Sequence, residues 1–188
     1  MDNPVVIVLI VLGVLAFLIL VWFISTMNTL RRKEVKVHEA ESGIDVALTK
    51  RFDTLSKMVD TVKGYTKHEA KTFENVVKWR KGMPSELTME QKQEFMRKLN
   101  DVQADINVAV ERYPDLKAEK VFTNLQRTIA DVEEHLQASR RLYNSNVSFL
   151  NRKIVTFPIS IVAARIGMDK KTFFEAELEK RADVKMEF

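Results

Sequence analysis

The pattern of hydrophobic and polar positions divides the chain into two unlike parts. Residues 5–24 form a run of twenty apolar residues, and from residue 25 onward apolar positions are interspersed with charged ones. A helix of twenty residues is about 30 Å long, which matches the hydrocarbon core of a bilayer. No basic residue precedes the run and no small-x-small cleavage pattern follows it, which disfavours a cleaved signal peptide. The pattern predicts an uncleaved transmembrane helix over residues 5–24.

The charges that flank this run predict its orientation. Asp2 is the only charged residue before it, whereas four basic residues follow it closely: Arg31, Arg32, Lys33 and Lys36. Basic residues next to a span stay cytoplasmic, so the amino terminus is expected outside the inner membrane and the bulk of the chain in the cytoplasm. The four residues are also candidate membrane-surface residues, since a cation near anionic lipid contributes about 1 kcal/mol. The alternative is that they serve only as a topology signal.

Beyond residue 25, apolar residues recur at spacings of three and four, which is typical of amphipathic helices. Three such series are present: Ile44, Leu48, Phe52, Leu55, Val59, Val62, Phe73 and Val76; Phe95, Leu99, Val102, Ile106 and Val110; Phe122, Leu125, Ile129, Val132, Leu136, Tyr143, Val147, Leu150 and Ile154. The fold predicted from them is all-α: a transmembrane helix followed by an elongated antiparallel bundle of three long helices, with short helices at the carboxy terminus.

Turn and capping residues place the boundaries of these elements. The first helix is expected to end at Gly82–Ser85, and Thr88 to Gln91 reads as a capping box for the second. Tyr113-Pro114 ends the second helix, with Asp115 as N-cap of a third helix to about Val155. Asp169 is expected to cap a last helix. The predicted organisation is an extracytoplasmic terminus (1–4), the span (5–24), a basic stalk (25–43), the bundle (44–155) and short carboxy-terminal helices (156–188).

The unequal helix lengths predict surfaces without partners. In an up-down-up arrangement the second helix returns only part of the way, and the third overshoots the first loop by roughly 20 Å. This leaves apolar positions uncovered near the membrane (Ile44, Leu48, Phe52) and at the far end (143–154). The sequence therefore predicts that the folded-back tail and neighbouring copies of the chain cover these stripes, with self-association as the consequence. The same geometry places residues 158–168 far from the bilayer, which favours their burial against the bundle or a neighbouring copy.

Gly64 interrupts the first helical series and allows two interpretations. It is either a C′ residue followed by a new capping box, or an internal glycine of a continuous helix. Val62 and Phe73 lie eleven residues apart, about 1100° of helical rotation, and so keep the same face. This phase favours a continuous helix in which Gly64 lets a neighbour approach closely, with Tyr65 beside it as a candidate packing residue.

The sequence contains no arrangement typical of an enzyme. Its histidines, His38, His68 and His135, belong to neither an H-E-x-x-H nor an E-x-x-H pattern, and there is no cysteine and no glycine-rich phosphate loop. The 30 basic and 26 acidic residues are interleaved along the helices, which argues against a nucleic-acid interface. No enzymatic activity, metal or cofactor is expected.

Several short motifs follow one another in order along the chain. They are Ile44-Asp45-Val46, Lys50-Arg51, Thr61-Val62-Lys63-Gly64-Tyr65, His68-Glu69, Tyr113-Pro114-Asp115-Leu116, Tyr143-Asn144, Phe157-Pro158 and Phe173-Phe174. Together they resemble the LemA family of bacterial membrane proteins. The resemblance implies one amino-terminal anchor and a helical-bundle domain, and it implies no catalytic residues. Phe52 stands where the family commonly has histidine, and Ser56-Lys57 where it commonly has Pro-Asn, so no chemistry of that histidine and no proline kink is expected.

Two classes of function are compatible with these features. The first is a structural, scaffolding or partner-binding protein that associates with the bilayer and with further copies of itself. The second is an accessory signalling or envelope-stress subunit that passes a membrane event to an unidentified cytoplasmic protein. The candidate interaction residues are Tyr143, Asn144, Phe157 and Pro158. For Tyr143 and Asn144 the alternative is a packing role for the ring and local hydrogen bonding for the amide.

Overall fold

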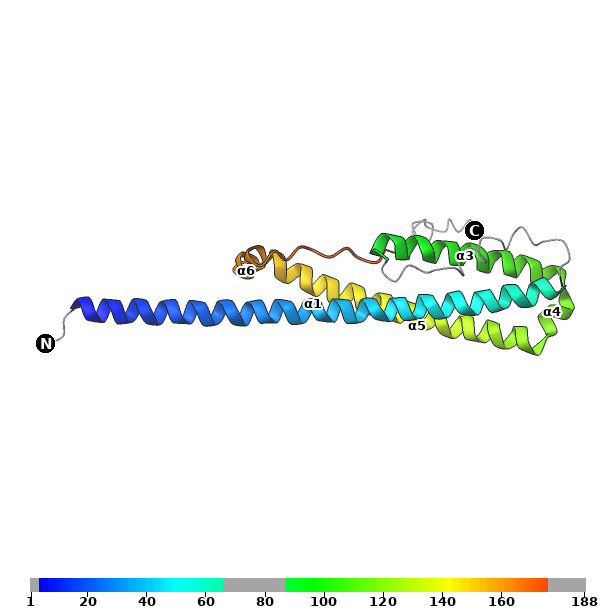
Figure 1. Ribbon diagram of the computed structural model, residues 1–188, viewed down its shortest axis with the longest axis horizontal. Coiled ribbons are helices and arrows are strands. Elements are labelled where there is room, and N and C mark those ends of the chain that lie inside the picture. The colour runs from blue at the N-terminus through cyan, green and yellow to red at the C-terminus, as the bar shows by residue number, and fades with distance from the viewer. Residues whose placement is uncertain (1–3, 66–86, 176–188) are drawn as a thin grey trace, which may run out of the picture. The chain divides into compact units, whose positions relative to one another are not determined.

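The computed structural model describes residues 4–65 and 87–175, and these residues form helices and connecting segments without a strand. The helices are α1 (Pro4–Tyr65), α3 (Met89–Arg112), α4 (Pro114–Ala118), α5 (Lys120–Val155) and α6 (Ile159–Arg165), as labelled in Figure 1. The all-α class predicted from the apolar spacing is confirmed. The expected turn at Gly82–Ser85 lies outside the described residues.

The start of α3 follows the sequence prediction in detail. The Thr88 hydroxyl accepts a hydrogen bond from the Gln91 backbone N–H at 3.3 Å, and the Gln91 side chain accepts one from the Thr88 N–H at 2.8 Å. This reciprocal pair satisfies two N–H groups that the first turn of a helix leaves open. The capping box at Thr88 is therefore confirmed.

The boundaries after α3 differ from the prediction in two places. Pro114, not Asp115, begins the next helix, and this α4 has only five residues before α5 starts at Lys120. The predicted end of the long helix at Val155 is confirmed. The helix expected after Asp169 is wrong for its first residues, because residues 168–175 have no regular secondary structure.

Side chains of neighbouring helices explain why the segment after Asp169 is not helical. The Asn151 amide donates to the Lys171 carbonyl and accepts from the Lys171 N–H, both at 2.9 Å. Gln93 and Arg140 donate to the carbonyls of Phe173 and Glu175 at 3.3 and 3.1 Å. These bonds occupy backbone groups that a helix would have paired internally.

The chain forms two compact units. Unit 1 comprises Met1–Glu39 with Asn144–Thr172, and unit 2 comprises Ala40–Tyr143 with Phe173–Phe188. Helices α1 and α5 each contribute to both units.

The core of unit 2 is built from the apolar series that the sequence predicts. The members that are at most 5 % exposed are Ile44, Leu48, Leu55, Val59, Val62, Phe95, Leu99, Ile106, Val110, Phe122, Ile129, Val132, Leu136 and Tyr143. The Phe52 ring lies 6.0 Å from the Phe95 ring. The 3.6-residue period thus identified the buried faces correctly.

The direction of α3 differs from the up-down-up prediction. Asp45 of α1 contacts Lys92 of α3, and Arg51 further along α1 contacts Gln103 further along α3. Residue numbers therefore rise together on the two helices, whereas one hairpin turn between them would have made them run oppositely. Between α1 and α5 the residue numbers run oppositely, since Gly43 lies beside Ser139 and Arg51 beside Glu133. This also differs from the up-down-up prediction, in which the first and third long helices run in the same direction.

The apolar stripes expected to lack partners are covered within the chain. In unit 2, Ile44 and Leu48 are fully buried, and in unit 1 the same is true of Val147 and Leu150. The expectation that these stripes need a neighbouring copy of the chain to cover them is therefore wrong, because it followed from the incorrect direction of the second long helix.

Packing in unit 1 begins earlier along the chain than the predicted bundle. Leu30 and Val37 of α1 are each 1 % exposed, although they belong to the segment expected to be a stalk. The Lys33 ammonium lies 4.2 Å from the centre of the Phe149 ring of α5, a cation–π contact within the same unit.

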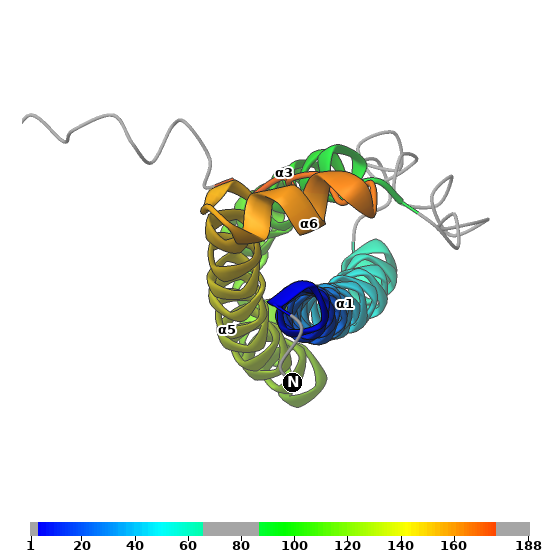
Figure 2. The ribbon, with the colours of Figure 1, turned by 90° about the vertical axis from the view of Figure 1, so that its left-hand side faces the viewer.

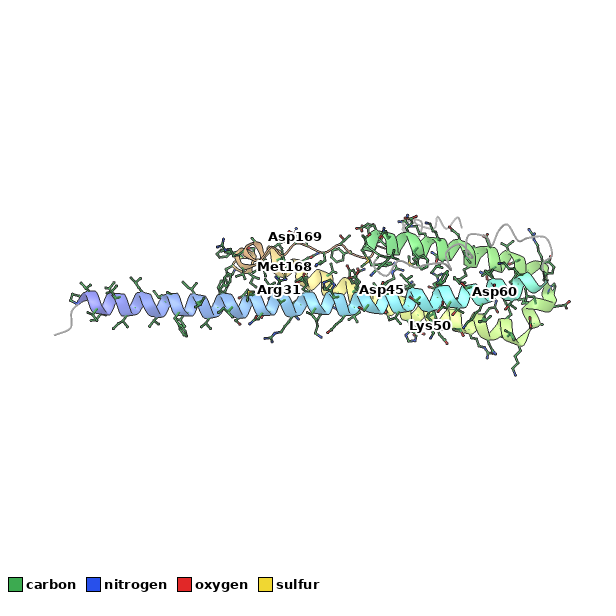
Figure 3. The ribbon with its side chains drawn as sticks, viewed as in Figure 1. Arg31, Asp45, Lys50, Asp60, Met168 and Asp169 are labelled. Carbon is green, nitrogen blue, oxygen red and sulfur yellow. The ribbon has the colours of Figure 1, made fainter. Side chains whose placement is uncertain are left out.

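The apolar run at the start of α1 projects its side chains freely. Its most apolar 18-residue window has a mean hydropathy of 3.4 and none of it is buried within the chain. Figure 3 shows these side chains standing out around the helix before the level of Arg31. The described part of the chain thus has one single helix long and apolar enough to cross a membrane, and the α5–α6 pair also reaches this criterion when its two members are taken together.

Gly64 lies in the last turn of α1, so the helix includes it, but the close approach expected there is not seen. A Cβ atom added at this position would meet none of the described atoms within 4 Å. We therefore expect Gly64→Ala to stabilise the fold by about 0.5–1 kcal/mol, because alanine loses less backbone entropy in a helix. Denaturant unfolding of the detergent-solubilised variant measures this gain. A destabilised variant would show that a neighbour does occupy the space.

Candidate functional site: the end of the apolar run in unit 1

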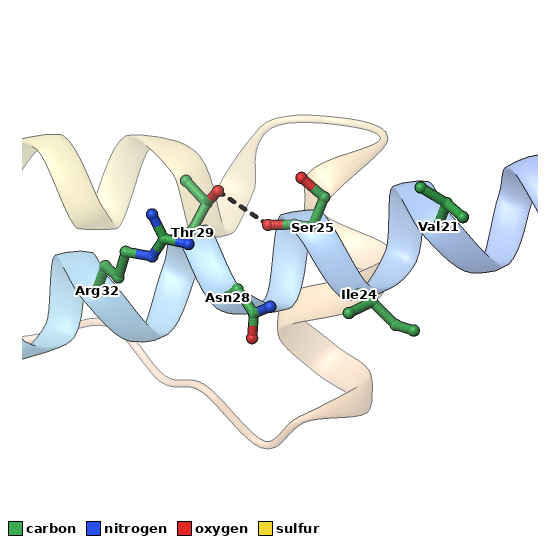
Figure 4. Close-up of a pocket in the computed structure, with 6 residues that line it drawn as sticks. All are labelled: Val21, Ile24, Ser25, Asn28, Thr29 and Arg32. Atoms are coloured by element: carbon green, nitrogen blue, oxygen red, sulfur yellow. Dashed lines mark hydrogen bonds between the residues drawn. The ribbon is translucent and has the colours of Figure 1, made fainter.

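The apolar run of α1 gives way to polar residues within one turn. Ser25, Asn28, Thr29 and Arg32 follow Ile24, and with Val21 they line an open hollow of ≈ 430 Å³ along one side of the helix (Figure 4). The Thr29 hydroxyl donates to the Ser25 carbonyl at 2.9 Å, which satisfies it within the helix. This turn is where a span would pass from hydrocarbon to the lipid headgroups.

The four basic residues predicted at the membrane surface differ in their surroundings. The Arg31 guanidinium lies 3.0 Å from Glu34, and the Lys36 ammonium 3.7 Å from Glu39. Arg32 is exposed, and Lys33 is half-buried over the Phe149 ring. All four residues lie within the twelve positions that follow the apolar run, as the sequence indicated.

Glu34 joins α1 to the segment that follows α6. Its carboxylate lies 3.0 Å from Arg31 and 3.1 Å from the Lys171 ammonium, and Figure 3 shows Met168 and Asp169 at the level of Arg31. Burial would raise the pKa of Glu34, but the hydrogen bonds from Lys171 and Arg31 outweigh it and hold the pKa below its usual value of 4.5.

The lowered pKa makes the Glu34 contact dependent on pH. A carboxyl whose pKa is lower in the folded state stabilises above its unfolded pKa, and the contribution is lost as the pH falls through the folded value. We expect Glu34→Gln to lower the melting temperature at pH 7 by the equivalent of about 0.5–1 kcal/mol, with the difference from wild type vanishing at strongly acidic pH. Thermal unfolding as a function of pH measures this, with Glu39→Gln as control. A difference independent of pH would contradict it.

Helix α6 lies beside the end of the apolar run, whereas the sequence had predicted that it lies far from the span. Ile159 at its start and Lys153 of α5 line one cavity of ≈ 190 Å³ together with Ser25, Thr29 and Leu30 of α1. The expectation that residues 158–168 lie far from the membrane end is therefore wrong. It depended on the assumed up-down-up order, in which the end of the long third helix points away from the span.

The direction and exposure of α6 distinguish two faces. It makes an angle of 97° with α5, and in the view along α1 it lies crosswise to that helix (Figure 2). Val162, Ala163 and the nearby Met168 are buried, as predicted for this segment. Phe157 is 76 % exposed and Ile161 58 %, so a second face carries large apolar side chains that nothing in the described chain covers.

Unit 2 contains a buried cation between two carboxylates. The Lys92 ammonium lies 2.8 Å from both Glu41 and Asp45, and the residue is only 4 % exposed. Burial would lower the pKa of Lys92, but its hydrogen bonds to Asp45 and Glu41 prevail and raise the pKa. Lys92 is thus held in its charged form as an ionic link between α1 and α3.

Two further polar side chains are buried in unit 2. Arg51, 3 % exposed, pairs with Glu133 and donates to the Gln103 side chain at 2.8 Å. Tyr143 is 4 % exposed, and burial, reinforced by the negative charges of Glu41 and Glu90, raises its pKa to about 12. Its ring closes the core of unit 2, which favours the packing interpretation of this residue.

The other candidate interaction residues are spread over the chain. Asn144 is half-buried in unit 1, Pro158 is the exposed N-cap of α6, and Tyr65 is the last residue of α1. No group of three or more metal-ligating side chains occurs within residues 4–65 and 87–175. The polar clusters of unit 2 are ion pairs between helices, with no nucleophile and base in contact among the pairs described above.

Sequence reasoning missed both the early packing of α1 and the ionic links. Leu30, Val37 and Ile44 follow at intervals of seven, a heptad signal that extends the first apolar series into the predicted stalk. Lys92 and Arg51 carried no such signal, because a charged residue on a helix is usually solvated.

These features define a class: all-α chains in which one freely projecting apolar helix of membrane length continues into a helical domain. The model of the LemA family matches residues 40–188, most of the chain. The chain belongs to the LemA family, and the resemblance of its motifs is confirmed. It is similar to Protein LemA of Metamycoplasma hominis, with 28% identity over 163 residues that cover 86% of this chain and 74% of that protein.

Proposed function

We propose that this LemA-family chain is a single-pass protein of the cytoplasmic membrane whose helical domain serves as a scaffold or partner-binding module. The observation that carries the proposal is the apolar run of α1, in which the most apolar 18-residue window has none of its side chains buried. A soluble protein seldom exposes so large a continuous apolar surface, whereas a bilayer covers it.

The proposed topology places the amino terminus outside and the helical domain in the cytoplasm. Its support is the charge asymmetry of the sequence, with four basic residues within the twelve positions that follow the run. The domain is proposed to be an elongated bundle held by the apolar series and by the Lys92 and Arg51 ion pairs.

A fractionation experiment tests anchoring and orientation separately. The full chain should remain with membranes in alkaline carbonate, and a protease added to the cytoplasmic face should degrade the part after residue 25. Extraction by carbonate would refute the anchor. Protection from protease at that face, with degradation from the opposite side, would refute the orientation alone.

We also propose that the chain self-associates. The apolar stripes from which the sequence predicted this are buried, so the contact would use another surface. The mass of the detergent-solubilised particle tests it. A particle containing one chain at micromolar concentration would refute it.

One observation favours the accessory signalling subunit as a second candidate. Helix α1 is continuous from Pro4 to Tyr65, so the proposed span and residues of unit 2 belong to one helix. A regulator recovered in stoichiometric amount from native membranes would support this candidate, and recovery of the chain alone would support the scaffold. On either view the chain is proposed to have no enzymatic activity and no cofactor.

A further inference from the structure

The α5–α6 corner of unit 1 combines three features at the end of the apolar run. It is close to the turn of α1 where apolar residues end, it carries exposed apolar side chains, and it is surrounded by basic residues. Each feature comes from a separate observation, and together they point to one kind of partner.

The position of the corner is fixed by contacts within unit 1. Ile159 and Lys153 share a cavity with Ser25, Thr29 and Leu30. Ser25 directly follows the apolar run, so α6 begins at the depth where a span along residues 5–24 would leave the hydrocarbon. Since α6 makes 97° with α5 and lies crosswise to α1 (Figure 2), it runs along the plane of a bilayer that α1 crosses upright.

The exposed side chains of the corner are large and apolar. Phe157, Ile161 and Val155 are 76 %, 58 % and 54 % exposed, whereas Val162 and Ala163 on the other face of α6 are buried. An amphipathic segment at the headgroup level buries such a face in the outer part of the acyl chains. The corner thus has one face that is buried in the protein and one exposed apolar face that is suited to contact lipid.

The charge of unit 1 complements an anionic surface. Its described residues include nine Lys and Arg but three Asp and Glu, a net charge of +6, while the 21 basic and 23 acidic residues elsewhere give −2. Arg152, Lys153 and Arg165 flank the apolar corner itself. Basic side chains near an apolar patch are the usual combination for binding anionic lipid headgroups.

We propose that the α5–α6 corner, residues 155–161, inserts into the headgroup region of an anionic bilayer as a second membrane contact beside the span. The inference rests on the proposed anchor, because the corner takes its depth from the end of the apolar run. The occupant of the exposed face is lipid, and a second copy of the chain or another protein would be a different outcome.

The chain contains no cysteine, so single cysteines carrying an environment-sensitive NBD label can report the depth of chosen positions. The labelled full-length variants are Phe157→Cys, Ile161→Cys, Val14→Cys in the apolar run, and Val121→Cys at the first turn of α5. Val121 serves as the matched control, because its exposed fraction of 55 % is similar to the 58 % of Ile161. Each variant is reconstituted into vesicles of phosphatidylcholine and phosphatidylglycerol that contain doxyl-labelled lipid, with the quencher either near the headgroup or near the bilayer centre.

The expected result is that shallow doxyl lipid quenches the labels at positions 157 and 161 about twofold or more over the label at 121, and that deep doxyl lipid quenches the label at 14 most. If the label at 14 is quenched but those at 157 and 161 match the control, the inference is overturned and the anchor stands. A blue-shifted but unquenched label at 157 would overturn it too, because protein then covers the face. If the label at 14 is unquenched, the proposed anchor fails and the inference falls with it.

Discussion

Replacing Leu12 and Leu15 together by arginine is expected to remove the protein from the carbonate-resistant membrane fraction. Both residues lie near the middle of the apolar run. Leu12 is 56 % exposed and Leu15 is 50 % exposed. An arginine at the centre of a span costs about 3 kcal/mol, so two cost about 6 kcal/mol, which corresponds to a change of roughly 10⁴-fold in the insertion equilibrium.

A matched control places the same two charges at the end of the run. The variant with Ser25→Arg and Asn28→Arg carries the same added charge, with the same spacing, in the turn that lines the hollow of Figure 4. Arginine at the interface costs little, because its side chain reaches the headgroups. This control should stay in the membrane fraction. If the Leu12, Leu15 variant also stays there, the apolar run is not a span.

Replacing Lys92 by methionine is expected to cause the largest loss of stability among the ionic side chains of unit 2. The change removes the ammonium that lies 2.8 Å from both Glu41 and Asp45 and leaves two carboxylates facing each other. Removing one partner of a buried pair costs about 3–5 kcal/mol. Because both carboxylates are partly exposed and can turn to water, we expect about 2–3 kcal/mol, measured as a melting temperature lower by roughly 5–10 °C.

The control for Lys92 lies on the same helix. Lys98→Met removes a lysine that pairs with Glu94 at 2.7 Å but is 44% exposed, and it should change stability by at most about 0.5 kcal/mol. The pH dependence gives a second check. Because the pKa of Lys92 is raised in the folded state, its contribution is complete below the usual value of 10.5 and is lost only above it. Equal melting temperatures for wild type and Lys92→Met at pH 7 would contradict the ionic link.

The helices and their buried faces followed from the sequence, but their directions did not. The spacing of Ile44, Leu48 and Leu55 identifies the buried face of α1 because helical geometry repeats every 3.6 residues. The parallel sense of α1 and α3 depends on which face meets which, and the pairing of Asp45 with Lys92 is not encoded in the period of either segment.

The candidate site shows the same limit. The basic cluster at Arg31 was evident from the sequence because its residues are close together in the chain. Its link to Lys171 was not, because Glu34, which pairs with Arg31, also pairs with Lys171 137 positions further along. The position of α6 was predicted wrongly because one incorrect helix direction moved it to the other end of the domain. Phe157 was named as an interaction residue from its motif, and its exposure became apparent only from the structure.

Under the proposed anchoring, the crosswise direction of α6 also limits how the protein can respond to bilayer thickness. A lone span adapts to a thicker or thinner membrane by tilting or by sliding along the bilayer normal. With α6 lying across the end of the apolar run, where Ile159 and Leu30 line one cavity, sliding would carry the basic residues that flank the α5–α6 corner into hydrocarbon, and tilting would lift one end of α6 into water. In such a protein the mismatch falls on the surrounding lipid, which must stretch or thin around a span of fixed depth.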